Sequence, residues 1–218
     1  MSDQKALRID APLFWRRAAK LYDAWKAGRG VAGSPWHGLD ALVIDTGKYD
    51  EEALYLRSTS MHNWLFGLEL PETVLLFTET MMYALAGSKK VGLLEAAMAE
   101  RPDDAPFSIL CYMRSKADGD AANYATLRDK LAGSYAGQAV ALLLKEAPVG
   151  DAAAAWRSAL AAAALSQRDL APAVSELLLV KDEAETAHVR VAGLVSAALV
   201  EQHLLSAIKT IIDEEKPA

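Results

Sequence analysis

The sequence predicts an α/β fold, with a mixed β-sheet flanked by helices and followed by one long C-terminal helix. Three observations predict this class. Short apolar runs typical of strands alternate with helical patterns between residues 72 and 164, as in layered α/β domains. The run at 138–144 is almost continuously apolar, as expected of a strand covered on both faces. From Lys181 and Asp182 onward, a helical pattern continues to about Asp213.

The first predicted element is a helix that begins at Ala11. Asp10 is placed to cap it, and Pro12 is tolerated in the first turn. Gly28 and Gly30 are expected to end it. Its apolar stripe consists of Leu13, Ala18, Leu21 and Trp25.

The segment 28–33 spells GRGVAG and matches the pattern G-x-G-x-x-G. The dinucleotide-binding fingerprint requires a strand before this pattern and a helix after it. Here a helix precedes it, and Ser34 and Pro35 follow. We therefore predict a flexible loop.

Strand-like runs surround a stretch with an unusual order of elements. The run 39–45 is predicted as the first strand. Residues 73–78 and 81–86 are predicted to form a β-hairpin, and a helix is predicted to start at Gly87 and Ser88.

A short helix is expected between the first strand and the hairpin, and it ends at Gly67. Trp64, Leu65 and Phe66 arrive together before this glycine and are interpreted as core residues rather than as a partner-binding pocket. Gly67 is expected to serve backbone geometry, through either a positive φ or close packing.

The second half of the chain continues the alternation, and residues 174–180 are apolar again before the last helix. That helix has about thirty residues and would be roughly 45 Å long, which is more than a small domain needs, so we expect its packing partner to lie outside this chain. The elements predicted before it are a loop at 101–106, a strand at 107–114, a helix at 118–133 capped by Asp118 or Asp120, a strand at 138–144, and an Ala-rich helix at 151–164 capped by Asp151.

Composition narrows the class of protein. The length of 218 residues fits one large domain or a domain with an appendage, and 52% hydrophobic residues are ample for a core. One cysteine excludes a disulfide framework and favours a reducing compartment. No run approaches the roughly 18 apolar residues of a membrane span, and charged residues interrupt any signal-peptide pattern at the N-terminus.

Charge is unevenly distributed along the chain. Residues 1–30 contain seven basic and three acidic residues, a balance of +4, whereas residues 39–79 contain eight acidic and two basic residues, a balance of −6. The net charge of the whole chain is also −6. This distribution argues against general affinity for nucleic acid and favours a basic partner.

No catalytic, cofactor or metal site is predicted from the motifs. Cys111 lies in an apolar run and is interpreted as a buried structural thiol rather than a nucleophile. Glu185-x-x-His188 has the spacing of half a di-iron site, but its companion ligands are missing. Ser206-x-x-Lys209 lacks the companion motifs of acyl-transfer enzymes. The acidic triplet 50–52 is read as a solvated turn, with a metal or a basic partner as the alternative.

Much of the chain resembles the N-terminal lobe of the large subunit of FACT, the eukaryotic histone chaperone. The resemblance is carried by FWRRAAKLYDAW at 14–25, LDALVID at 39–45, DEEALYLRSTSMHNWLFGLELPETVLLFT at 50–78, and LLLVKDEAET at 177–186. That lobe is similar in turn to the N-terminal lobe of aminopeptidase P and creatinase, the pita-bread peptidases. The resemblance implies a lobe at 1–176, and at 177–218 a linker and the first helix of an otherwise absent C-terminal lobe.

The resemblance implies a non-catalytic interaction domain of the nucleus and chromosome, without cofactor or metal. It would contribute to nucleosome reorganisation in transcription, DNA replication and repair. The implied partners are histones, the replication machinery, and the smaller FACT subunit through parts of the protein absent here. Neither sequence-specific nucleic acid nor a membrane is implied. Glu69 and Glu72, near the turn, are the candidate partner-binding residues.

Two other functions stay open at this point. The chain is alternatively the substrate-side lobe of a metal-dependent Xaa-Pro peptidase of the pita-bread type, whose metal ligands would lie in the second lobe. It is also readable as a scaffold that dimerises through the apolar stripe of its last helix.

Overall fold

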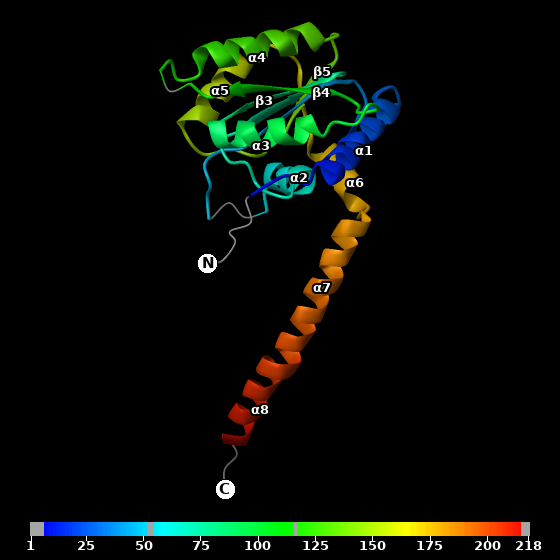
Figure 1. Cartoon of the computed structure of the whole chain (residues 1–218), viewed down its shortest axis with the longest axis vertical. Helices are drawn as coiled ribbons and strands as arrows, with labels where there is room; N and C mark the ends of the chain where they lie inside the picture. The colour runs from blue at the N-terminus through cyan, green and yellow to red at the C-terminus, as the bar shows by residue number, and fades with distance from the viewer. Residues whose placement is uncertain (1–6, 52–54, 116, 215–218) are drawn as a thin grey trace. The chain divides into compact units, whose positions relative to one another are not determined.

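The computed structural model describes residues 7–51, 55–115 and 117–214. The chain divides into two compact units, Met1–Leu177 and Leu178–Ala218. The first contains a β-sheet with its surrounding helices, and the second is one long helix (Figure 1).

The sheet has six strands in the order β4-β3-β2-β1-β5-β6. Its centre is antiparallel, because β2 pairs in opposite direction with both β1 and β3. The flanking pairs β3 with β4, β1 with β5, and β5 with β6 are parallel, so the predicted mixed sheet is confirmed. The strands are β1 (Leu39–Asp45), β2 (Val74–Phe77), β3 (Met81–Ala86), β4 (Ser108–Met113), β5 (Ala139–Leu142) and β6 (Gln167–Asp169).

Helices cover both faces of this sheet (Figure 1). One face carries α1 (Ala11–Arg29), α2 (Arg57–Phe66) and α3 (Ser88–Ala99), and the other carries α4 (Ala121–Ser134) and α5 (Asp151–Ala161). A shorter helix, α6 (Ala171–Leu179), follows β6 and begins where the Asp169 carboxylate accepts a hydrogen bond from the Ala171 N–H, 3.1 Å away.

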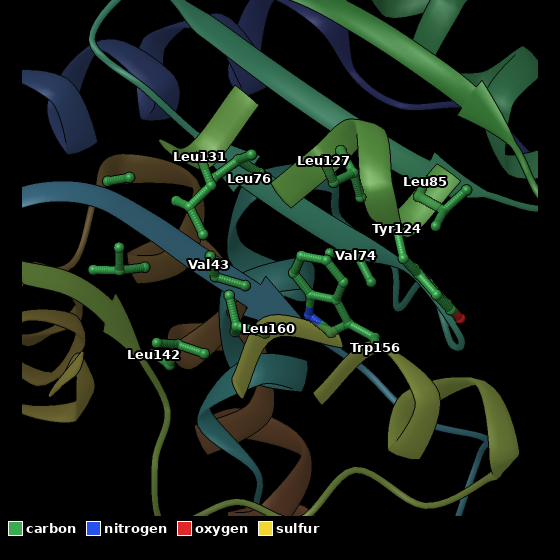
Figure 2. Packing of buried hydrophobic residues seen from close by; sticks show 12 residues of the cluster. Val43, Val74, Leu76, Leu85, Tyr124, Leu127, Leu131, Leu142, Trp156 and Leu160 are labelled. Carbon is green, nitrogen blue, oxygen red and sulfur yellow. The ribbon is translucent and has the colours of Figure 1, made fainter. Parts of the chain in front are cut away.

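Two apolar layers hold the lobe together. Between the sheet and α4 and α5, Trp156 packs with Tyr124, Leu127, Val43 and other buried residues (Figure 2). The opposite layer is aromatic: the rings of Phe14 in α1 and Phe66 in α2 stack with centroids 5.5 Å apart. β1 lies between these layers and is buried along its whole length, as expected of a central strand.

The three large apolar residues before the glycine turn are core residues, as predicted. Trp64, Leu65 and Phe66 are buried at the end of α2. Gly67 follows with φ of 71°, and a Cβ built there would meet nothing within 4 Å. Gly67 therefore serves backbone conformation rather than close packing.

Several predicted boundaries are wrong. Gly30 is the C-cap of α1, as predicted, but Gly28 lies inside the last turn instead of ending the helix. A Cβ at Gly28 would come within 2.4 Å of the Ser34 Oγ atom, so this glycine permits the close approach of the returning loop. Asp151 is the first residue of α5, which is preceded by Gly150 and ends at Ala161.

The predicted start of the helix after β4 also shifts, from Asp118 to Ala121. Asp118 accepts a hydrogen bond from the Ala122 N–H and so supplies the capping interaction. Asp120 stands at the N-cap position, but its carboxylate accepts hydrogen bonds from Arg114 Nε, the Ser115 N–H and the Asn123 side-chain amide rather than from a backbone N–H of the helix.

The second unit is a continuous helix of 32 residues, Glu183–Glu214, as predicted. It consists of α7 (Glu183–Leu199), a π-helical turn at Val200–Leu204 and α8 (Leu205–Glu214). Asp182 and Glu185 form a reciprocal capping box at its start. None of its residues is buried. Although no uninterrupted apolar run spans it, its length and composition alone would suffice to cross a membrane.

Candidate functional site

The candidate site lies where the path of the chain diverges at one edge of the sheet. β1 and β5 are adjacent and parallel, so their carboxyl ends meet at this edge. From β1 the chain continues toward α2 and β2, whereas from β5 it continues toward α5 and β6 on the other side. In open α/β sheets, ligands bind in the crevice formed at such a divergence.

A cleft of about 270 Å³ occupies this position. It lies between the loop after β1, the loop after β5, and the start of α2. Its described lining residues are Thr46, Gly47, Lys48, Tyr49, Asp50, Tyr55, Leu56, Ser58, Thr59, Glu69, Ala147, Pro148 and Val149.

Gly47 fixes the two loops against each other. The Lys48 N–H donates to the Val149 carbonyl at 2.7 Å, and the Gly47 carbonyl accepts from the Glu72 N–H at 2.7 Å. A Cβ on Gly47 would lie 2.3 Å from the Val149 nitrogen, so only glycine permits this approach. The floor of the cleft is therefore set by backbone contacts.

Glu146 closes the amino end of α2. Its carboxylate accepts hydrogen bonds from the Arg57 N–H at 2.6 Å, the Ser58 N–H at 3.3 Å and the Ser58 hydroxyl at 2.7 Å. The N-cap residue Leu56 makes no side-chain capping bond. A distant carboxylate thus satisfies two of the free N–H groups and complements the positive end of the helix dipole.

The two predicted partner-binding residues lie in different places at this edge. Glu69 is half-buried, lines the cleft, and accepts a hydrogen bond from the Thr59 hydroxyl at 3.3 Å. Glu72 is also half-buried and pairs with Arg114 at 3.5 Å, outside the cleft lining. Arg114 in turn pairs with the buried Asp120 at 2.8 Å.

Two nitrogen bases near this turn have lowered pKa values, the buried His62 and the half-buried Lys90. Burial lowers the pKa of His62 to about 3, with a further contribution from the nearby charge of Lys90. His62 Nδ1 accepts a hydrogen bond from the Leu70 N–H at 3.3 Å, so the ring is neutral. Burial also lowers the pKa of Lys90, whose ammonium donates to the Pro71 carbonyl.

The end of β1 contains a buried ion pair. Both Asp45 carboxylate oxygens accept hydrogen bonds from Arg157 of α5, each at 2.6 Å. Burial raises the pKa of Asp45, and the hydrogen bond and charge of Arg157 oppose this shift. The pair joins the central strand to the helix that covers it.

Other candidates from the sequence lie apart from the cleft. Cys111 is half-buried on the edge strand β4 rather than buried, and burial raises the pKa of its thiol to about 11, so the thiol stays protonated. Of the acidic triplet, Asp50 lines the cleft, Glu51 is exposed, and Glu52 lies outside the described residues. Within the described ranges, no three His, Cys, Asp or Glu side chains are grouped to hold a metal ion.

Sequence reasoning missed most of the residues that build this edge. Glu146 and Arg114 stand in separate loops and match no motif, because Glu146 binds Arg57, 89 positions away, and Arg114 binds Glu72, 42 positions away, as well as the nearby Asp120. The one available signal was Thr46–Gly47 after an apolar strand, which indicates a turn but not its partner.

The comparisons with known proteins agree with one another. Residues 9–173 match the family described as the FACT complex subunit SPT16 N-terminal lobe domain. The chain is 31% identical over 211 residues to the FACT complex subunit SPT16 of Dictyostelium discoideum; the match covers 94% of this chain and 19% of that protein. The chain thus spans about a fifth of the length of the curated relatives it matches.

Solved structures show the same fold. The N-terminal domain of FACT complex subunit SPT16 from Cicer arietinum superposes with a TM-score of 0.85 at 24% identity, covering 95% of this chain and 47% of that one. A Xaa-Pro dipeptidase from Bacillus anthracis superposes with a TM-score of 0.51 at 14% identity, covering 88% and 43%. The predicted likeness to the N-terminal lobe of the pita-bread peptidases is confirmed at the level of fold.

Proposed function

This chain belongs to the family of the SPT16 N-terminal lobe of the FACT complex, and from that premise we propose that it is a non-catalytic interaction lobe of a histone chaperone. The observation that carries the proposal is the family match over residues 9–173, which includes the complete sheet. In this role the lobe would act in the nucleus, on chromosomes, during nucleosome reorganisation in transcription, replication and repair.

Charge supports histones as the direct partner. Residues 39–79 carry a balance of −6, and they include β1, α2, β2 and one wall of the cleft. Asp40 and Asp45 are buried and paired with Arg29 and Arg157, so the surface charge comes from the other acidic residues of this range, among them Asp50 and Glu69 at the cleft. An acidic surface attracts a basic protein over distances comparable to the Debye length, so the contact is expected to weaken as salt rises.

A non-catalytic role is supported by how the polar groups at the carboxyl edge are used. Asp45 is paired with Arg157, Asp120 with Arg114, and Glu146 caps α2. Each carboxylate is committed to a structural contact that holds two elements together. The peptidase alternative has support from the fold alone, because the matching dipeptidase is 14% identical.

We further propose that the long helix is the first element of a second lobe in the longer protein. Between Val191 and Val200 no residue is charged and Ser196 is the only polar side chain, so this part is apolar around its circumference, and a helix of this kind is buried on all sides, in protein or in lipid. Glu201, Gln202 and His203 interrupt the apolar surface, which disfavours lipid because a charge near mid-membrane costs about 2.5–3.5 kcal/mol. A dimer of two such helices would cover only one face of each helix and leave its other apolar faces exposed, whereas a second lobe could bury the helix on all sides.

The direct test is titration of the chain with a tetramer of histones H3 and H4 at increasing salt. We expect binding at low ionic strength that weakens steadily as salt is added. Absence of binding even at the lowest ionic strength would contradict histone contact by this lobe. The peptidase alternative places its metal ligands in a second lobe, so the assay that separates it is hydrolysis of a Xaa-Pro dipeptide by the longer protein with added divalent metal. We expect no hydrolysis, and turnover above background would favour the peptidase alternative.

A further inference from the structure

The cleft between the loops after β1 and β5 has the size of a site for one side chain. Its volume of about 270 Å³ lies just below the range of about 300–1,000 Å³ that is usual for small-molecule and cofactor sites. The hydrogen bonds between Lys48 and Val149 and between Glu72 and Gly47 join its walls into one framework. A preformed opening of this size admits an extended amino-acid side chain.

Aromatic rings stand at the cleft with most of their surface in solvent. Tyr49 is 67% exposed and Tyr55 is 96% exposed, and both line the opening. Tyr55 also has a left-handed backbone, with φ of 71°, which is uncommon for an aromatic residue. Exposed tyrosine faces attract cations such as ammonium and guanidinium groups.

The charges around the cleft also favour a positively charged ligand. Asp50 and Glu69 contribute two carboxylates, against one ammonium from Lys48. The stem of Lys48 runs past Gly150, where a Cβ would meet its Cγ, Cδ and Cε atoms at 3.1–3.4 Å. The amino end of α2, a helix terminus at the cleft that could otherwise bind an anion, is already occupied by the Glu146 carboxylate. The cleft therefore favours a cation over an anion.

We propose that this cleft binds the lysine or arginine side chain of a basic protein segment, with Glu69 and Asp50 opposite its charge and Tyr49 and Tyr55 against its stem. The inference rests on the proposed histone contact for the source of that segment. It adds to that proposal a defined recognition point, at which one cationic side chain is held in an opening rather than attracted to an acidic surface in general.

The probe is a fluorescein-labelled Gly/Ser peptide that contains four spaced lysines, measured by anisotropy against the full chain in low salt. We expect Glu69→Gln to weaken binding at least fivefold, while the Gln side chain still accepts the hydrogen bond from Thr59. Tyr55→Ala is expected to weaken binding at least threefold. A peptide of the same length with norleucine in place of lysine is expected not to bind, because it retains the stem without the charge.

The matched control is Glu79→Gln, which removes the same charge from an exposed carboxylate on the opposite edge of the sheet. It is expected to change affinity less than twofold. Equal weakening by Glu69→Gln and Glu79→Gln would show general electrostatic attraction and overturn the inference, as would binding of the norleucine peptide. Circular dichroism on each variant confirms that the fold is retained.

Titration of the same variants with the H3–H4 tetramer separates this inference from the proposed function. If the tetramer binds wild type and Glu69→Gln equally, the cleft proposal fails and the histone proposal stands. If the lysine peptide binds with the expected pattern and the tetramer does not bind, the histone proposal fails and the cleft proposal stands.

Discussion

Asp45 ends the central strand with a carboxylate that is almost fully removed from water, and Arg157 is the partner that compensates for this burial. The two side chains form a bidentate pair, with 2% of the Asp45 side chain exposed. Removing one member of a buried pair leaves an uncompensated charge, which costs more than the pair itself contributes.

We expect Arg157→Ala to lower the free energy of unfolding by about 3–5 kcal/mol at pH 7. Burial already raises the pKa of Asp45, and loss of Arg157 removes the interactions that oppose this shift. The native state then holds the Asp45 proton more tightly than the unfolded chain, so the free energy of unfolding falls as pH rises between the two pKa values. Urea denaturation at pH 4.5 and pH 7 is expected to show a smaller deficit at the lower pH.

The matched double variant Asp45→Asn with Arg157→Ala tests the cause of this loss. It carries no buried charge, so part of the stability at pH 7 should return and the additional pH dependence should disappear. A double variant as unstable as Arg157→Ala alone would show that lost packing, rather than the unpaired carboxylate, accounts for the effect.

His62 makes stability depend on pH in the opposite direction. Its native pKa of about 3 lies below the ordinary value of 6.5, because burial and the charge of Lys90 disfavour the protonated ring. The unfolded chain therefore binds the extra proton first, and the free energy of unfolding falls as pH drops below 6.5. Between pH 7 and pH 5 we expect His62 to contribute a loss of about 2 kcal/mol.

Denaturation of His62→Gln at both pH values measures this contribution. The variant is expected to lose about 2 kcal/mol less than wild type over the interval. The exposed His203 serves as the control, since His203→Gln should keep the wild-type loss. An unchanged difference in His62→Gln would contradict the assignment of this titration to His62.

At the scale of single residues, the sequence predicts burial better than partnership. Burial of Trp64, Leu65 and Phe66 could be predicted because large apolar side chains at the end of a helix are stabilised by removal from water. The contacts of Glu69 and Glu72 could not be predicted, since Thr59 and Arg114 are brought to them only by the fold. A carboxylate in a turn has the same sequence signature whether it is solvated or paired.

Among the elements, α2 depends on a cap supplied from another part of the chain. Glu146 provides the acceptors for the first N–H groups of this helix. We expect Glu146→Ala to destabilise the lobe by about 0.5–2 kcal/mol, as for loss of other helix caps. Hydrogen exchange should show faster exchange in the first turn of α2, with little change in α4.

Glu146→Gln is the informative comparison for this cap. It retains a neutral acceptor but loses the charge that complements the helix dipole, so its cost should lie between those of wild type and Glu146→Ala. Equal stability of all three proteins would show that water replaces the cap without cost.

Helices and strands could be predicted where the local sequence pattern determines them, but not where they form only by pairing with a distant strand. The capped helix from Ala11 and the strand at Leu39–Asp45 follow from local signals. Gln167–Asp169 is polar and becomes β6 only by pairing with β5. The helix α6 was missed because the short apolar run at 177–180, with Val174 before it, fits a strand as well as a helix.

For the whole molecule, the long helix is the feature with the largest consequence in solution. Its apolar side chains are exposed along the length of Glu183–Glu214 within the part that the structure describes, with Leu194 the most exposed of them at 73%. We expect the full chain to associate as concentration rises, and a chain ending at Lys181 to remain monomeric in light scattering. Thermal unfolding of the sheet-containing unit should be unchanged by this truncation.

Substitution on the helix distinguishes apolar association from any effect of length. Leu194→Glu with Leu205→Glu should reduce association of the full chain to the level of the truncated one. Ser196→Glu, which adds charge without removing an apolar contact, serves as the control and should have a smaller effect. A strict monomer at high concentration would contradict the expected association.

The strand order also determines when the lobe can be completed during synthesis. β1 is paired on one side with β2, which follows closely, and on the other with β5, which is translated roughly a hundred residues later. β1 through β4 can therefore assemble while one edge of β1, buried in the finished lobe, still lacks its neighbour. At about 5–20 residues per second, this edge stays open for several seconds on the ribosome, and in that interval the nascent chain has most need of a molecular chaperone of its own.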